Sequence, residues 1–254
     1  MNADRIARLS RSGVAVEVVA QTGSTNADLL ARAPRLAQPV LLVAEHQTAG
    51  RGRAGRSWLS EPDHSLTFSL AWRFADGLRG LAGLPLAVGV ALAETLDRLG
   101  QPVQLKWPND VLKDGDKLAG ILVETQVTPD GAAWTIVGIG VNLVMPDALE
   151  EKIGRSAAAV PWLARMDRDE LMAALLDGLA DALSLFARAG FAAFAARWNV
   201  LHAWQGRPVE LLDRGEIQHE GLAAGVDDTG RLLLDTAAGR VTIVAGDVSL
   251  RACD

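Results

Sequence analysis

The chain has 254 residues, of which 49% are hydrophobic and 22% charged, and its formal net charge is -6. This composition is that of a globular protein with room for one large domain, or a large domain and a small one. The acidic balance argues against a general nucleic-acid binder, and a single cysteine excludes an intramolecular disulfide and a thiolate-rich zinc site.

No segment of the sequence predicts a membrane span or a secretory signal. The best candidate, residues 81–96, is shorter than the roughly 20 apolar residues that a bilayer requires, and Pro85 interrupts it. It therefore predicts a buried helix, and the cytoplasm is the expected compartment. Cys253, next to the last residue, is interpreted as an incidental thiol rather than a nucleophile.

The N-terminal part of the chain predicts a strand, a short helix and a second strand. Residues 14–20 are rich in valine and predict the first strand, and Ser24 and Thr25 can then cap a helix. The uninterrupted apolar run at 40–46 predicts a strand buried on both sides. The apolar positions expected on the buried face of the helix are Ala27, Leu30 and Ala31.

The middle of the chain predicts four more strands and a long helix. Residues 65–72 alternate between large apolar and small polar side chains, which predicts a half-buried strand. A long helix follows through about residue 99. Three further strands are expected at 103–107, 118–125 and 133–144, with residues 113–116 as the turn between the first two of them.

The C-terminal part changes character near residue 205. Residues 168–199 have a helical pattern, whereas short strands separated by turn residues follow Gly206. We therefore expect two domains, at 1–205 and 206–254, the second a small antiparallel β-barrel. The fold class expected for the whole chain is α+β, with a mixed β-sheet and flanking helices in the first domain.

The stretch GRGRAGRS, residues 50–57, fits both a dinucleotide-binding pattern and a P-loop spacing. Both patterns bind phosphate at the N-terminus of a helix, but Pro62 and the strand expected from Ser65 leave no room for one. Two interpretations remain open: a flexible surface loop with solvated arginines, or a loop whose arginines bind an anion and whose glycines allow a close approach.

Three other stretches carry candidate functional residues. Asn109 and Asp110 in KWPND either form a turn or lie at the carboxyl end of a strand, where open α/β folds bind ligands. Lys117 begins a strand, and two glycines interrupt the apolar strand GIGVN at 138–142, which indicates close approach or tight packing. The histidines lack a metal-ligand spacing, and nothing indicates a covalent nucleophile. Such residues suit the charge stabilisation of phosphoryl and nucleotidyl transfer.

Taken together, five motifs in this order resemble the biotin protein ligase family. They are STN (24–26), AEHQTAGRGRAGRSW (44–58), KWPND (106–110), KLAGILVE (117–124) and GIGVNL (138–143). The resemblance implies a mixed sheet of the class II aminoacyl-tRNA synthetase-like type with a C-terminal β-barrel. It also implies that biotin and ATP, with Mg²⁺, react to biotinyl-AMP, and that an acceptor lysine then receives the biotinyl group.

The resemblance assigns roles to individual residues. The residues implied for biotin are Ser24, Thr25, Asn26, Gln47, Gly50, Arg51, Gly52, Arg53, Lys117, Gly138 and Gly140. Those implied for ATP and the adenylate are Arg53, Arg56, Trp58, Lys106, Asn109, Lys117 and Asn142. Catalytic roles are implied for Arg53, Lys117 and Asp110, and Asp110 either holds Mg²⁺ or orients the acceptor lysine. Gly138 and Gly140 would let the biotin ring approach a strand.

The partner implied by the resemblance is the biotin carboxyl carrier domain of a biotin-dependent carboxylase, and both a monomer and a homodimer remain open. Some family members carry an N-terminal DNA-binding domain, but only about 13 residues precede the first strand, so no DNA binding is expected. Residues 59–64 depart from the family pattern, which leaves their path open. Two alternatives are a lipoate or octanoate ligase of the same fold and a nucleic-acid-binding regulatory module.

Overall fold

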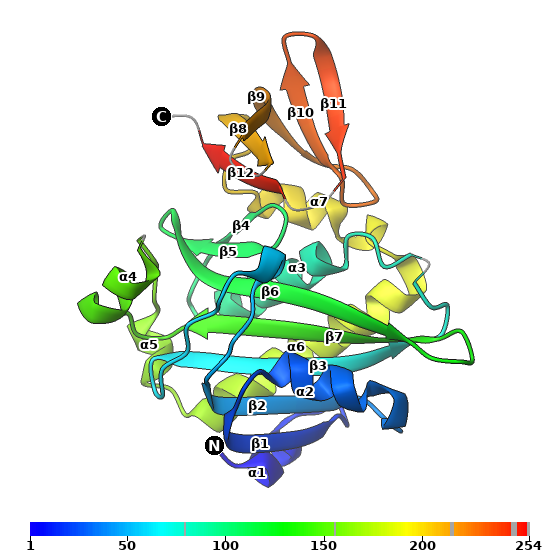
Figure 1. Ribbon diagram of the computed structural model, residues 1–254, viewed down its shortest axis with the longest axis vertical. Coiled ribbons are helices and arrows are strands. Elements are labelled where there is room, and N and C mark those ends of the chain that lie inside the picture. Colours follow the sequence, from blue (N-terminus) through cyan, green and yellow to red (C-terminus); the bar gives the residue numbers. More distant parts are fainter. Residues whose placement is uncertain (79, 155, 214–215, 245–247, 253–254) are drawn as a thin grey trace.

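The structure is a computed structural model that describes residues 1–254 except 79, 155, 214–215, 245–247 and 253–254. A large region built on one β-sheet is followed by a smaller region with a sheet of its own (Figure 1). Cys253, and with it the interpretation of its thiol, lies outside the described residues.

The large region contains a seven-stranded mixed sheet with the strand order β1-β2-β3-β7-β6-β5-β4. β1 and β2 pair in parallel, and the other neighbouring strands are antiparallel. The strands are β1 (Ala15–Thr22), β2 (Val40–Gln47), β3 (Ser65–Phe74), β4 (Gln104–Lys106), β5 (Asp110–Lys113), β6 (Asp116–Val127) and β7 (Ala133–Asn142). The mixed sheet expected from the sequence is confirmed.

The sequence prediction missed β5. Residues 107–109 form the turn between β4 and β5, so Asp110 begins a strand instead of ending a turn. The turn expected at 113–116 joins β5 to β6, where Asp114 and Gly115 have positive φ angles of 52° and 92°. A four-residue strand is too short to show a period, which is why the pattern did not indicate it.

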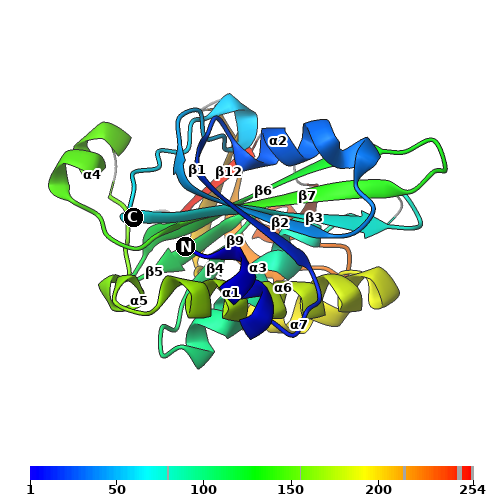
Figure 2. The same cartoon turned by 90° about the horizontal axis from the view of Figure 1, so that it is seen from below.

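Helices cover both faces of the seven-stranded sheet. α2 lies on one face, and α3 and α6 lie on the other (Figure 2). The helices are α1 (Ala3–Leu9), α2 (Thr25–Arg32), α3 (Leu84–Arg98), α4 (Asp147–Ile153), α5 (Pro161–Ala164), α6 (Arg168–Ala189) and α7 (Ala192–Leu201), with 3₁₀ turns η1 (Ala33–Arg35) and η2 (Arg53–Gly55). The predicted helices α2, α3, α6 and α7 are confirmed, whereas the short helices α1, α4 and α5 were not predicted.

The face under α3 and α6 forms the main hydrophobic core. Alternate residues of the central strands point to this face, and most of them are buried. They include Leu41, Val43, Leu66, Phe68, Leu70, Ile121, Val137, Ile139 and Val141. The apolar stretch near 81–96 supplies α3, so it is a buried helix as expected. Among the described residues, no helix is both long and apolar enough to span a membrane.

The face under α2 differs from the prediction in two places. β3 is buried on both sides, because its polar alternates Thr67 and Ser69 are also covered, with exposures of 1% and 0%. The predicted inner face of α2 is wrong as well: Thr25, Asn26 and Leu29 are buried, whereas Ala31 is exposed. Helix α2 therefore turns polar side chains toward the sheet. Hydrophobic periodicity could not reveal this orientation, because it assumes that the apolar side is the inner one.

The C-terminal region is an antiparallel sheet of five strands with the order β11-β10-β9-β8-β12. Its strands are β8 (Pro208–Asp213), β9 (Glu216–Val226), β10 (Leu232–Thr236), β11 (Gly239–Ile243) and β12 (Val248–Ala252). The antiparallel arrangement is confirmed, but across the described residues the pairing is that of an open sheet with β11 and β12 at its edges, and not of a closed barrel. The indole of Trp107 donates to the carbonyl of Gly230 at 3.2 Å and so connects the two regions.

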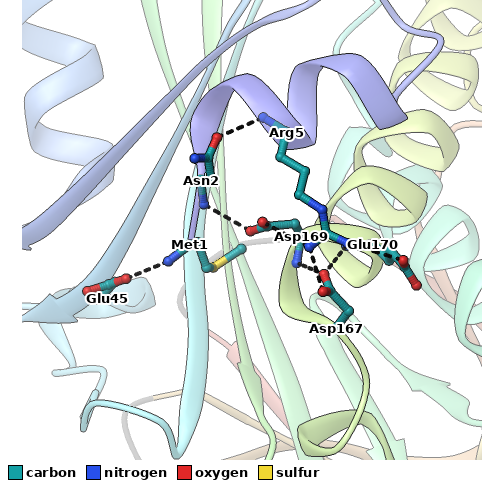
Figure 3. A network of polar contacts seen from close by, with 7 residues as sticks. All are labelled: Met1, Asn2, Arg5, Glu45, Asp167, Asp169 and Glu170. Carbon is teal, nitrogen blue, oxygen red and sulfur yellow. Dashed lines mark hydrogen bonds and ion pairs between the residues drawn. The ribbon is translucent and has the colours of Figure 1, made fainter.

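Helix α1 is attached to the start of α6 by charged contacts. Figure 3 shows the residues involved: Met1, Asn2, Arg5, Glu45, Asp167, Asp169 and Glu170. Arg5 donates to Asp167 at 2.5 Å, and the backbone N–H of Asn2 donates to Asp169 at 3.0 Å. The hydrogen bond from Arg5 lowers the pKa of Asp167, which also caps α6. These contacts hold α1 beside β1, at the edge of the sheet.

Candidate functional site

A cavity of about 450 Å³ opens on the face of the sheet that carries α2. It lies between the N-terminus of α2, the loop 50–58, the strands β6 and β7, and the end of α4. The residues that line it are Ser24, Thr25, Asn26, Gln47, Arg51, Gly52, Arg53, Arg56, Ser57, Trp58, Leu59, Phe68, Ser69, Asn109, Lys117, Gly120, Ile121, Leu122, Gly138, Ile139, Gly140, Asn142, Lys152, Ile153 and Ala157.

One end of the cavity is a buried network of uncharged polar groups. The carboxamide oxygen of Gln47 accepts from the backbone N–H of Thr25 at 2.8 Å and from its hydroxyl at 3.1 Å. The hydroxyl of Ser69 lies 2.7 Å from that of Thr25 and donates to the carboxamide oxygen of Asn26 at 2.6 Å. Ser24 caps α2 through its side chain. These contacts hold hydroxyls and amides in fixed positions, which is what recognition of an uncharged polar ligand requires.

The glycine-rich loop is a narrow hairpin and not the start of a helix. The backbone N–H of Trp58 donates to the carbonyl of Gly50 at 2.9 Å, and that of Gly52 donates to Arg56 at 2.6 Å. Between them lies the single 3₁₀ turn η2, in which Ala54 and Gly55 have φ angles of 53° and 69°. The helix that a dinucleotide motif or a P-loop requires is therefore missing at this loop, as the sequence predicted.

Two arginines attach this hairpin to side chains along β6. Arg51 donates to Glu124 on β6 at 2.9 Å, and Arg53 donates to the side-chain oxygen of Asn109 at 3.1 Å. Asn109 is itself fixed, because its amide donates to the carbonyl of Ile121 at 2.8 Å. The loop therefore lines the cavity and is held beside β6 by two side-chain contacts, without a helix dipole.

Trp58 lies against the floor of the cavity over two glycines. A Cβ atom at Gly140 would overlap the indole ring, and one at Gly120 would come within 3.2 Å of it. A Cβ atom at Gly138 would likewise overlap the carboxamide of Asn26. These glycines thus make room for protein side chains, in addition to any room they leave for a ligand. The indole Nε1 of Trp58 is buried and has no hydrogen-bond partner within the described part of the chain.

Lys117 lies at the other end of the cavity from the polar network. It forms an ion pair with Asp110, and both side chains are largely buried. Its ammonium group also lies 5.9 Å from the ring centre of Trp58. Asn142 fixes the backbone here, because its amide donates to the carbonyls of Lys117 at 3.3 Å and Ala158 at 3.1 Å.

The charge of the cavity is opposite to that of the chain. Its described lining contains no aspartate or glutamate, although the chain carries a net charge of -6. The basic side chains of the lining are Arg51, Arg53, Arg56, Lys117 and Lys152. Such a concentration of cations in one cavity favours a polyanionic ligand. Among the described residues, no group of three or more His, Cys, Asp or Glu side chains could hold a metal ion.

The segment 59–64, whose path the sequence left open, runs beside the ends of β2 and β7. The hydroxyl of Ser60 accepts from the backbone N–H of Gln47 at 3.4 Å, and the carbonyl of His64 accepts from Leu143 at 2.8 Å. Ser60 is buried. The segment 59–64 therefore contacts Gln47 of the cavity wall, although its sequence departs from the family pattern.

The structure brings most of the predicted site residues together, but three do not line the cavity. Gly50 contributes its backbone to the base of the hairpin, and Asp110 reaches the cavity through Lys117. Lys106 lies elsewhere, with its ammonium 4.9 Å from the ring centre of Trp204. The structure also places Ser69, Glu124 and Lys152 at the site, none of which the sequence assigned a role.

Comparison with known proteins gives consistent matches. Residues 17–142 match the Biotin/lipoate A/B protein ligase family, and residues 206–251 match the Biotin protein ligase C terminal domain. The chain is 36% identical over 249 residues to the Bifunctional ligase/repressor BirA of Escherichia coli, covering 95% of this chain and 76% of that protein. It is 38% identical over 242 residues to the Biotin--[acetyl-CoA-carboxylase] ligase of Mycobacterium tuberculosis, covering 92% and 88%.

Among solved structures, the chain resembles a biotin protein ligase from Aquifex aeolicus in complex with biotin and ATP. The TM-score is 0.81 at 30% sequence identity, and the match covers 94% of this chain and 99% of that one.

Proposed function

Because this chain belongs to the biotin/lipoate A/B protein ligase family and is an enzyme of the biotin protein ligase type, we propose that it activates biotin as biotinyl-AMP and transfers it to an acceptor lysine. The acceptor is the biotin carboxyl carrier domain of a biotin-dependent carboxylase, in keeping with the name of the Mycobacterium tuberculosis relative. ATP and biotin are the substrates.

The observation that carries the proposal is the division of the cavity into an uncharged polar end and a cationic end. The hydroxyls and amides of Thr25, Gln47 and Ser69 offer both donors and acceptors to the ureido group of biotin. Lys117 lies toward the other end, where a carboxylate and a triphosphate have to meet, whereas Arg51 contacts Glu124 beside the polar network. An elongated ligand with one neutral polar end and one anionic end fits this arrangement.

In the first step an oxygen of the biotin carboxylate attacks the α-phosphorus of ATP. The new bond gives the mixed anhydride biotinyl-AMP, and the bond to the β,γ-phosphates breaks to release pyrophosphate. Both reactants are anionic, so their approach has to be stabilised by fixed cations. Lys117 is suited to the carboxylate and α-phosphate oxygens, and Arg53 and Arg56 to the phosphates, as the resemblance implied for these residues.

In the second step the neutral amine of the acceptor lysine attacks the carbonyl carbon of the anhydride. An amide forms, AMP leaves, and the amine loses a proton. Asp110 is one candidate for holding the acceptor lysine, because it already pairs with an ammonium group, that of Lys117. Holding Mg²⁺ is the other role that the resemblance implies for Asp110, and both roles remain proposals.

The hairpin has a role between the two steps, when the anhydride is exposed to hydrolysis. It lines the cavity, and Arg51 and Arg53 fix it to Glu124 and Asn109. We therefore assign it the exclusion of water and the retention of the adenylate. The resemblance assigns Trp58 and Asn142 to the adenine, and the buried Nε1 of Trp58, which has no hydrogen-bond partner among the described residues, can donate to a ligand.

The test is pyrophosphate release measured with MgATP and either biotin, lipoate or octanoate. Release with biotin, and little with the other two acids, supports the proposal. Release with lipoate or octanoate alone would favour a lipoyl-type ligase of the same fold. Salt-dependent DNA binding without any pyrophosphate release would favour the regulatory module instead.

A further inference from the structure

One carboxylate at the wall of the cavity, that of Glu124, has no role in the proposed steps. Glu124 lies on β6, and it points to the same face of the sheet as Gly120 and Leu122, which line the cavity. One quarter of its side chain is exposed. Glu124 is the last residue of KLAGILVE, one of the five motifs that resemble the family, but the resemblance implied no role for it.

Two cavity-lining side chains donate to the same oxygen of Glu124. The amide of Asn26 donates to Oε2 at 2.9 Å, and so does the guanidinium of Arg51, also at 2.9 Å. Asn26 belongs to the polar end of the cavity, whereas Arg51 belongs to the hairpin that lines it. Glu124 is therefore the direct link between the polar network and the hairpin.

The link continues beyond Asn26. Because the Asn26 amide donates to Glu124, its carboxamide oxygen is turned toward Ser69, which donates to it at 2.6 Å. Ser69 in turn lies 2.7 Å from the hydroxyl of Thr25, which donates to Gln47. The orientation of four side chains at the polar end thus depends on where Asn26 finds its acceptor. Hydrogen bonds to a charged acceptor are stronger than neutral ones, so the carboxylate is suited to set this orientation.

We propose that Glu124 is a positioning residue that couples the biotin end of the cavity to closure of the arginine hairpin. This inference rests on the proposed function. The carboxylate holds Asn26 in the orientation that presents the polar network, and it holds Arg51 so that the hairpin stays closed over the adenylate. It touches neither substrate, and both effects act through the residues that it binds.

Removing the carboxylate has two separable consequences. Asn26 loses its charged acceptor, so binding of biotin weakens while binding of ATP is left nearly unchanged. Arg51 loses the contact with Glu124, so the hairpin is held less firmly and retains the adenylate less well. A merely structural role for Glu124 would instead lower the melting temperature and alter both substrate affinities alike.

The experiment compares Glu124→Ala and Glu124→Gln with a matched control, Glu17→Ala. Glu17 also pairs with an arginine across two elements of the same region, with 2.6 and 2.7 Å to Arg32, but it does not line the cavity. Biotin-dependent pyrophosphate release gives KM for biotin and for ATP. Transfer of labelled biotin to free amines in solution, without a carrier domain, measures escape of the adenylate.

We expect Glu124→Ala to raise KM for biotin about tenfold and escape of the adenylate about fivefold, with KM for ATP within about twofold. Glu124→Gln keeps an oxygen acceptor and should recover most of both losses, and Glu17→Ala should match the unmutated protein. The double variant Arg51→Ala/Glu124→Ala should release no more adenylate than Arg51→Ala alone, because either change removes the same contact between Arg51 and Glu124.

Two results would contradict parts of the account separately. If the unmutated protein releases pyrophosphate with biotin but Glu124→Ala does so with unchanged KM and unchanged escape, the positioning role is wrong and the proposed function stands. If the unmutated protein shows no biotin-dependent release, the proposed function itself fails.

Discussion

The two faces of the seven-stranded sheet are made by the same strands but carry different side chains. On the face under α3 and α6, alternate residues such as Leu70, Val137 and Val141 form the hydrophobic core. On the face under α2, their neighbours in sequence are Ser69, Gly138 and Gly140, and they line the cavity. Within a single strand, therefore, one alternate set of residues packs the core and stabilises the fold, and the other set lines the cavity.

This difference teaches how to interpret an alternating strand. Small polar residues between large apolar ones look like a solvent-facing side, yet Thr67 and Ser69 are fully buried here. They tolerate burial because each has a partner: Thr67 donates to the carbonyl of Ala44 at 3.0 Å, and Ser69 donates to Asn26. Changes on the two faces should consequently affect different measurements.

The largest expected effect comes from Lys117→Ala on the cavity face. It removes the cation proposed to stabilise the carboxylate and α-phosphate, so adenylate formation should fall about 1,000-fold. The melting temperature should also fall, because the largely buried Asp110 loses its partner, so release is measured at a temperature where the variant is folded. Single-turnover pyrophosphate release measures the first quantity, and a thermal melt measures the second. Lys113→Ala is the control, because Lys113 is the last residue of β5, donates to the carbonyl of Pro102 and does not line the cavity. A similar loss of adenylate formation in this variant would argue against a specific role of Lys117.

On the opposite face, Leu92→Ala should have the reverse signature. Leu92 is 1% exposed in α3, so truncation leaves a cavity in the core and lowers the free energy of unfolding by about 3 kcal/mol. Both KM values should stay within about twofold at temperatures where the variant is folded. Urea unfolding and steady-state kinetics measure the two quantities. A large change in KM without loss of stability would break the division between the faces.

A smaller effect is expected from Gly140→Ala, which tests the floor of the cavity. The added methyl group overlaps the indole of Trp58, so the ring has to move and KM for ATP should rise about tenfold. Gly89→Ala adds the same methyl group on the apolar side, where the nearest atom is the flexible side chain of Leu105 at 3.3 Å. Kinetics of that control should be unchanged. Equal behaviour of the two alanine variants would show that Trp58 does not depend on Gly140.

The smallest expected effect is that of Ser69→Ala, which removes one hydroxyl from the polar network. KM for biotin should rise about threefold to tenfold, since one net hydrogen bond is lost and the carboxamide of Asn26 loses a donor. Ser65→Ala lies on the same side of β3 but contacts Ser60 and not Asn26, and should leave KM for biotin unchanged. Steady-state pyrophosphate release at varied biotin concentration would measure KM for both variants. Equal losses in the two variants would contradict a specific function of Ser69.

Most of the large elements could be predicted from the sequence, because β2, α3, β7 and α6 have long, regular patterns. β5 and α4 could not, since they are short and few of their residues are buried. The inner face of α2 was predicted wrongly because its buried side chains, Thr25 and Asn26, are polar and bind Gln47 and Glu124. Tertiary contacts of this kind leave no period in the sequence.

In the candidate site, too, residues with a conspicuous sequence pattern could be predicted, and residues that act through tertiary contacts could not. The glycines and arginines of the hairpin stand out in sequence, and the structure places them around one cavity. Ser69 and Glu124 do not stand out in sequence, because the residues that they contact, Asn26 and Arg51, are distant along the chain. The signal that could have found Ser69 is the regular occurrence of small uncharged residues, rather than charged ones, between the apolar residues of β3. The domain boundary near residue 205 and the individual roles of the site residues remain predictions.

The most direct test of the central claim is a mass spectrum of a purified biotin carboxyl carrier domain after incubation with this protein, biotin and MgATP. The account predicts the mass of one biotinyl group added to the domain, dependent on ATP and lost with Lys117→Ala. An unmodified domain in the presence of biotin, with an adduct formed from lipoate or octanoate instead, would contradict it.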